Sequence, residues 1–158
     1  MRIEAVILII AWLITIIGLI IFVPKNKIRE AFVIFLFKQV ITWIFGLLVV
    51  ELGLIVYPVR SFAHATWTNF DFEYMIYPAT CVIFNLYYPV GKKGFRQFMH
   101  YVIYCSAITI IEIFIERYTD ILDYIHWNWF VTWITLFITF YISRKFYLWF
   151  FKIYKKVE

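Results

Sequence analysis

The sequence predicts an all-α integral membrane protein, a bundle of five transmembrane helices with the N-terminus outside and the C-terminus in the cytoplasm. Of the 158 residues, 65% are hydrophobic, whereas a soluble domain is close to half apolar. The apolar residues fall into five long stretches. The basic residues concentrate in every second connection between these stretches. We expect one domain over residues 1–158.

The first two stretches are long enough to cross a bilayer. Residues 5–23 are almost unbroken aliphatic sequence and end before Pro24. This apolar core exceeds that of a signal peptide and no small-residue cleavage site follows it, so we expect a retained helix. Residues 31–57 form the second span, up to Pro58. Its Lys38 lies near the cytoplasmic end, and we expect the side chain to extend back to the headgroups.

The other three stretches are predicted at residues 74–88, 98–117 and 129–143. The first of these is the shortest, and Pro78 is expected to kink it or to reset its start. A basic, aromatic C-terminal tail follows the fifth span. Its aromatic run at residues 146–151 is expected to continue the helix along the membrane surface.

The count of Lys and Arg sets the predicted orientation. The first connection, the third connection and the C-terminal tail hold three, three and five of them, whereas the N-terminus and the other two connections hold one each. Positive residues favour the cytoplasmic side. The net charge of +5 therefore suits anionic headgroups on that side. We expect the lipid bilayer as the surroundings and no nucleic-acid partner.

Acidic and polar side chains inside spans are costly and usually have a role. Cys105, Thr109, Glu112 and Glu116 share one stripe at helical spacing. Glu51 is expected to lean toward the midplane from the outer end of its span. The candidate pocket or ion-binding residues are Glu51, Glu112, Glu116, Asn85, Tyr77 and Thr109, and the candidate rim residues are Arg60, Arg117, Asp123 and His126. Together they predict a polar core that grows more acidic toward the outside.

Three functional hypotheses stay open on these residues. The first is an outward-facing acidic pocket that binds or moves a small cation or a proton. The second is a non-catalytic membrane subunit or scaffold, in which the polar side chains only hold helices together, as a homo-oligomer or with a membrane partner protein. The third is a metal-dependent intramembrane lipid hydrolase.

Motifs for catalysis are missing from the sequence. The three histidines, His64, His100 and His126, do not form an H-E-x-x-H pattern, and no nucleotide-binding or serine-hydrolase motif occurs. Cys81 and Cys105 lie inside spans and are expected to act as small apolar side chains. We therefore assign no catalytic residue, metal ligand or cofactor, and a protein that is not an enzyme is favoured.

Three blocks of sequence are similar to one family: VPKNKIRE at residues 23–30, VELGLIVYPVR at 50–60 and IERYTDILDYIHWNWFVTWITLFITFYISRKFYLWF at 115–150. They resemble a family of small multi-pass membrane proteins from endospore-forming Gram-positive bacteria, over nearly the whole chain. That family has no assigned activity. The resemblance implies the membrane class and a bacterial plasma membrane, and it implies no catalytic residues.

Overall fold

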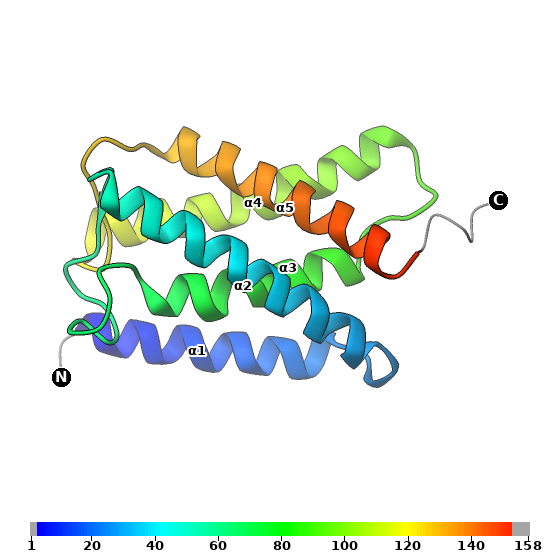
Figure 1. Cartoon of the computed structure of the whole chain (residues 1–158), viewed down its shortest axis with the longest axis horizontal. Helices are drawn as coiled ribbons and strands as arrows, with labels where there is room; N and C mark the ends of the chain where they lie inside the picture. Colours follow the sequence, from blue (N-terminus) through cyan, green and yellow to red (C-terminus); the bar gives the residue numbers. More distant parts are fainter. Residues whose placement is uncertain (1–2, 153–158) are drawn as a thin grey trace.

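The computed structural model describes residues 3–152, which are mostly helical and contain five α-helices. The helices lie side by side along the long axis of the molecule, so that the two ends of the described chain lie at opposite ends (Figure 1). Helix α1 (Ile3–Phe22) ends close to its predicted boundary. A short turn of 3₁₀ helix, η1 (Lys25–Lys27), leads from it into α2 (Ile28–Glu51).

Helix α2 ends six residues before the predicted boundary at residue 57, and the reason is local. Gly53 adopts a positive φ of 64°, which costs glycine little. Its amide donates to the Val50 carbonyl, and the Leu54 amide donates to the Val49 carbonyl, both at 2.9 Å. This pair of bonds is the Schellman motif that closes helices before a left-handed glycine. The chain after Glu51 therefore leaves the helix direction.

The third helix begins with a single π-helical turn, η2 (Phe72–Ile76), which continues into α3 (Tyr77–Leu86). In the π turn the Tyr77 amide donates to Phe72, so the Glu73 carbonyl loses its usual partner. Pro78 has no amide hydrogen, which frees the Tyr74 carbonyl as well. Side chains of α2 satisfy both groups: Thr42 Oγ1 donates to Glu73 O (2.6 Å), and Gln39 Nε2 donates to Tyr74 O (2.8 Å). Pro78 thus marks a change of helix type that docks η2 on α2.

Helices α4 (Gly94–Tyr118) and α5 (Trp129–Phe150) pack against each other. Asn128 caps α5, because its Oδ1 accepts from the Phe130 and Val131 amides at 3.0 and 3.1 Å. The helix begins where the sequence predicts and continues without a break beyond residue 143, through most of the aromatic run. Lys155 and Lys156 of the predicted tail lie outside the described residues.

A small β-structure modifies the predicted all-α fold. Strands β1 (Ile55–Val56) and β2 (Asp123–Tyr124) pair antiparallel, with Ile55 opposite Tyr124. They join the connection after α2 to the connection after α4. The first of these connections is further tied down at Asp71, which accepts hydrogen bonds from Trp12 Nε1 (2.8 Å) and Ser61 Oγ (3.0 Å). Ordered connections therefore cover this end of the bundle.

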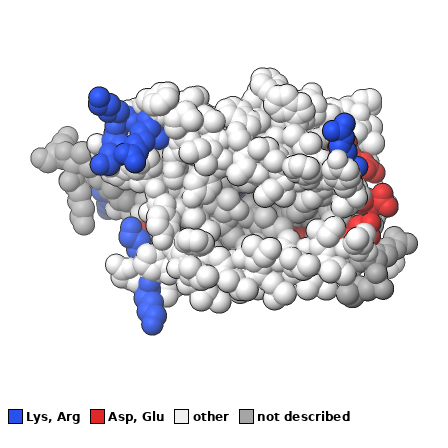
Figure 2. Space-filling model, turned by 180° about the vertical axis from the view of Figure 1, so that it is seen from behind, with Lys and Arg blue, Asp and Glu red and all other residues white. Residues whose placement is uncertain are grey.

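Charge separates the two ends of the molecule (Figure 2). The basic end, where α1, α3 and α5 finish, carries Lys25, Lys27, Arg29, Lys92, Lys93, Arg96, Lys145 and Lys152. The acidic end, where α2 and α4 finish, carries Glu51, Asp71, Glu116, Asp120 and Asp123 beside Arg60 and Arg117. Between the ends the surface in Figure 2 carries almost no charge.

Three of the helices are long and apolar enough to cross a membrane: α1, α2 together with η1, and α4. Their large apolar side chains are widely exposed; Ile20 of α1, for example, is 74% exposed. Helix α5 has 22 residues but includes a row of hydroxyl side chains and two basic residues. Helix α1 packs on α3 and η2 at one edge of the bundle, while α2 packs on both α3 and α5 (Figure 1).

Candidate functional site

A cavity of about 90 Å³ lies inside the half of the bundle nearer the acidic end. Helices α2, α4 and α5 form its walls together with η2 and the start of α3, and the connections that carry β1 and Trp127 line it at the acidic end. Its polar lining consists mainly of carboxyl and hydroxyl groups, among them Tyr57, Glu73, Tyr77, Glu112, Thr132 and Thr139. A volume of this size has room for a few water molecules.

Glu112 of α4 sits in this cavity inside a set of hydroxyl donors. Tyr124 and Thr132 donate to its Oε1 at 2.6 and 2.9 Å, and Tyr77 donates to its Oε2 at 2.9 Å. The Thr132 hydroxyl in turn accepts from Trp127 Nε1 at 2.7 Å. Hydrogen bonds to a carboxylate compensate part of the cost of burying its charge. Three separate segments of the chain are thus held around one acid.

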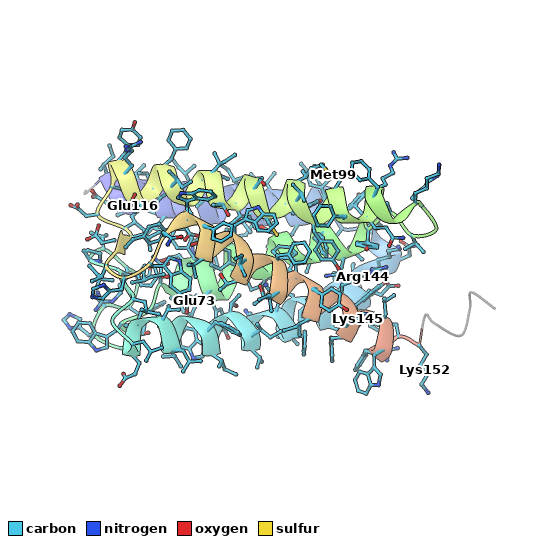
Figure 3. All side chains as sticks on the ribbon, turned by 90° about the horizontal axis from the view of Figure 1, so that it is seen from above. Glu73, Met99, Glu116, Arg144, Lys145 and Lys152 are labelled. Atoms are coloured by element: carbon cyan, nitrogen blue, oxygen red, sulfur yellow. The ribbon has the colours of Figure 1, made fainter. Side chains whose placement is uncertain are left out.

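Glu73 enters the same cavity with much weaker support. Its side chain is 2% exposed, and neither carboxylate oxygen has a hydrogen-bond partner of ordinary geometry among the described residues. Thr68 is the one side chain close enough to favour the ionised Glu73 carboxylate among the described residues, and its hydroxyl also lies 3.0 Å from Thr66 Oγ1. The carboxylate lies against α2 at Gly46, where an added Cβ would be 1.8 Å from its Oε1. In Figure 3, Glu73 lies in the half of the molecule that ends at Glu116.

Tyr57 and Tyr124, on the connections that β1 and β2 join, lie close to the carboxylates of this cavity. Burial raises the pKa of Tyr57 well above its usual value, and the nearby Glu73 and Glu112 carboxylates raise it further. Burial also raises the pKa of Tyr124, as does Glu112, which accepts its hydroxyl proton in a hydrogen bond. Both tyrosines therefore stay neutral over the ordinary pH range, and Tyr124 remains a donor to Glu112.

Lys38 is fully buried, and the expectation that it extends to the membrane surface is wrong. Its Nζ donates to Thr139 Oγ1 at 2.6 Å and lies 4.6 Å from the centre of the Phe140 ring. Both partners belong to α5. Lys38 lies on the same face of α2 as Ile34 and Thr42, which points into the bundle. Helix orientation about its own axis therefore decides the direction of this side chain.

The structure brings two predicted pocket residues together, since Tyr77 donates to Glu112 in the cavity wall. Glu51 does not join them: it is exposed at the end of α2, because the helix stops there and turns away. Glu116 is half-buried one turn beyond Glu112. It lies close enough to Tyr124 for its carboxylate to contribute to the raised pKa of that tyrosine. Thr109 is buried, and its hydroxyl has no partner among residues 3–152.

Asn85 belongs to a different polar cluster, nearer the basic end. Its Nδ2 lies 3.4 Å from Ser143 Oγ and donates to the Cys81 carbonyl at 3.0 Å. Its backbone carbonyl accepts from the Arg144 guanidinium at 3.2 Å, and that group also stacks on the Tyr88 ring at 4.1 Å. Asn85 therefore stabilises helix packing away from the cavity that holds Glu112.

The four predicted rim residues lie at the acidic end but do different things. Arg60 shapes its own loop by donating to the Tyr57 and Thr66 carbonyls, both at 2.7 Å. Arg117 and His126 are exposed. Asp123 is half-buried in β2, opposite Val56.

The sequence reading missed Glu73, which it assigned to a surface connection. A signal was present, because Glu73, Tyr77, Cys81 and Asn85 follow one another at a spacing of four residues and so share one helical face. Gly46 was a second signal, since a glycine inside a helix permits close approach of a neighbour. Tyr57 and Tyr124 had no such periodicity, because the β1–β2 pairing that places them joins distant segments.

Within the described residues, no three His, Cys, Asp or Glu side chains are grouped as a metal site would need. Comparison with protein-family models, curated proteins and solved structures finds no match to this chain. The arrangement of the cavity itself is therefore the basis for the functional argument.

Proposed function

We propose that the chain is a small multi-pass membrane protein whose acidic end faces outward and whose internal cavity binds or moves a small cation or a proton. The single observation that carries this proposal is the Glu73 carboxylate. It is buried, neither of its oxygens has a hydrogen-bond partner of ordinary geometry among residues 3–152, and it shares a cavity with the Glu112 carboxylate. An ionised carboxylate in such a place needs a cation, and a neutral one needs a proton.

The proposed topology has five spans. In addition to the three long apolar helices, α5 and the η2–α3 segment would lie within the bilayer, the latter reaching about 22 Å at 1.5 Å per residue. Such a short segment can cross where neighbouring helices shield its ends or where the bilayer is locally thin. The basic end would then meet anionic headgroups on the cytoplasmic side. By the resemblance of its sequence blocks, we place the protein in a bacterial plasma membrane.

Thermal unfolding of the purified protein in mild detergent tests the proposed pocket. We expect chloride salts of Na⁺, K⁺, Mg²⁺ or Ca²⁺, or a lower pH, to raise the midpoint of the wild type at constant ionic strength, because a ligand that binds only the folded state stabilises it. Glu73→Gln and Glu112→Gln should each reduce this response. Glu51→Gln is the matched control and should leave it unchanged, since Glu51 is exposed.

The proposal fails if the wild type shows no response to any of the four cations or to pH. It also fails if the double variant Glu73→Gln/Glu112→Gln responds as strongly as the wild type. If the three single variants respond similarly to cations and pH, the binding site lies outside the cavity.

A further inference from the structure

Beyond the two carboxylates, the cavity leads to the buried Lys38. Thr139 lines the cavity, and its Oγ1 accepts the hydrogen bond from Lys38 Nζ at 2.6 Å. Among residues 3–152, no carboxylate forms an ion pair with this ammonium group. A buried charge without a counter-ion is costly and is rarely kept without a role.

The polar side chains continue past Lys38 toward the basic end. Cys81 and Cys105 are the titratable groups near Lys38, on α3 and α4 respectively. Cys81 Sγ lies 3.1 Å from Ser143 Oγ, which leads to Asn85 and then to the Arg144 guanidinium. In Figure 3, Arg144 lies in the half of the molecule opposite to Glu73. The buried Glu73 and Glu112 therefore lie in one half, and the buried Arg144 lies in the other, where the half-buried Glu30 accepts a hydrogen bond from Tyr147, on whose ring Arg144 also packs.

This distribution of charge favours the passage of protons over the passage of metal ions. A metal cation could stay beside Glu73 and Glu112, but it would be repelled from the ammonium of Lys38 in a medium of low dielectric constant. A proton can pass when Lys38 is neutral, because the lone pair of the amine accepts it and any of the three N–H bonds of the resulting ammonium can then break.

We infer that the species moved through this protein is the proton, and that Lys38 relays it between the two halves of the interior. In the step itself, an O–H bond of the Glu112 or Glu73 carboxyl group breaks, and cavity water carries the proton to Thr139 Oγ1. The Thr139 O–H bond, which donates to the Leu136 carbonyl at 3.0 Å in the structure, turns to the neutral Lys38 amine and breaks as its proton is transferred. A new N–H bond forms there, and the carboxylate takes up a proton from the outer solution. Another N–H bond of the Lys38 ammonium then breaks, and its proton passes through water to the solution at the basic end, which restores the neutral amine. The inference rests on the proposed function, which allowed either a cation or a proton.

Proton uptake into vesicles tests the relay. Purified protein would be reconstituted into phosphatidylcholine–phosphatidylglycerol vesicles containing a pH-sensitive dye, with an inside-negative potential set by K⁺ and valinomycin. We expect the wild type to acidify the interior and to carry no ²²Na⁺. Lys38→Met should reduce acidification to the level of empty vesicles, and so should Lys38→Arg, because a guanidinium does not release its proton. Lys92→Met, at an exposed turn, is the matched control and should act as wild type.

A second variant covers the case in which loss of Lys38 prevents folding. Thr139→Val keeps the lysine but removes the hydroxyl that joins it to the cavity, and we expect slower acidification with a monodisperse elution profile. Undiminished acidification in Lys38→Met or in Thr139→Val, or transport of ²²Na⁺ by the wild type, would overturn the relay.

The outcomes separate this inference from the proposed pocket. If the Glu73→Gln and Glu112→Gln variants lose acidification while Lys38→Met keeps it, the relay is wrong and the acidic pocket stands. If the wild type does not acidify the vesicles but is stabilised by cations in detergent, the protein binds cations without moving protons. Absence of both effects would overturn both proposals.

Discussion

Two glutamates of the same cavity differ in the support that the fold gives them. Glu112 accepts hydrogen bonds from three hydroxyl groups, whereas Glu73 is also buried and accepts none of ordinary geometry from the part of the chain that the structure describes. Satisfied buried acids stabilise packing, and unsatisfied ones mark places where a ligand or a proton is needed. This contrast between two side chains, rather than the number of acids, is the support for the proposed binding pocket over a purely structural role.

The hydroxyl donors of Glu112 make a prediction about stability. Tyr124→Phe removes the 2.6 Å hydrogen bond to Oε1 and should lower the free energy of unfolding by about 1–3 kcal/mol. Thermal unfolding followed by tryptophan fluorescence would measure the change. Tyr118→Phe is the control, because Tyr118 is 72% exposed, and it should have little effect. Equal effects of the two variants would contradict the assigned role of Tyr124.

The two buried tyrosines predict a response to alkaline pH. Their pKa values are raised on folding, so the folded protein holds protons that the unfolded chain releases above the ordinary tyrosine pKa of about 10. Stability should be unaffected below that pH and should fall as the pH rises above it. Tyrosinate absorbance near 295 nm in Tyr57→Phe and Tyr124→Phe, compared with wild type, would identify the late-titrating groups. Titration of both near pH 10 would contradict the prediction.

At the level of single elements, the π turn η2 is the feature that creates the cavity wall. It frees the Glu73 carbonyl, Pro78 frees the next one, and Thr42 and Gln39 of α2 bind both. These bonds hold the Glu73 side chain against Gly46. Single π turns are frequent at functional sites, and this one carries Glu73, the buried acid that lacks an ordinary hydrogen-bond partner within residues 3–152.

Close contact between α2 and η2 makes Gly46 sensitive to substitution. The Cβ of Gly46→Ala would overlap the Glu73 carboxylate, so we expect a loss of about 1–3 kcal/mol and a weaker response to cations. In a Glu73→Ala background the same substitution should cost almost nothing, which a double-mutant cycle would measure. Gly18→Ala, where an added Cβ meets no atom within 4 Å, is the control. Additive effects at Gly46 and Glu73 would show that the two residues do not meet.

On the scale of the whole molecule, the charged ends and the apolar middle define an axis (Figure 2). The ends of the described chain lie at opposite ends of this axis (Figure 1). Under the proposed topology the acidic cavity then faces outward, and the basic end and its aromatic side chains lie at the cytoplasmic surface. The orientation decides from which side the cavity is filled.

Thiol labelling tests this orientation directly. Cys81 and Cys105 are fully buried and should not react in the folded protein. In intact cells, a membrane-impermeant maleimide should label Asp120→Cys at the acidic end and spare Lys92→Cys at the basic end until the membrane is opened. The reverse pattern would invert the proposed orientation. Labelling of both positions from outside would contradict the proposed five-span topology.

Local patterns were enough to predict the helical class, because apolar runs of this length are visible without any knowledge of partners. The start of α5 at Trp129 agrees with the predicted span, and the described part of α1 begins at Ile3, two residues before the predicted start. The end of α2 at Glu51 also has a local cause, the glycine at position 53, but the predicted boundary rests on the more distant Pro58. This error of six residues in the predicted end of the helix is the reason why Glu51 is predicted to lie in the pocket, whereas it is exposed in the structure.

Contacts between distant segments decided the rest. Whether Lys38 reaches the surface or enters the interior depends on how α2 is turned toward α5, where Thr139 binds it. The meeting of Glu73 with Glu112 depends on the docking of η2 onto α2, and the tyrosines around them depend on the β1–β2 pair. Periodicity within one helix shows which residues share a face but not which other helix that face meets. The helices are therefore determined by the chain locally, whereas the cavity exists only through tertiary packing.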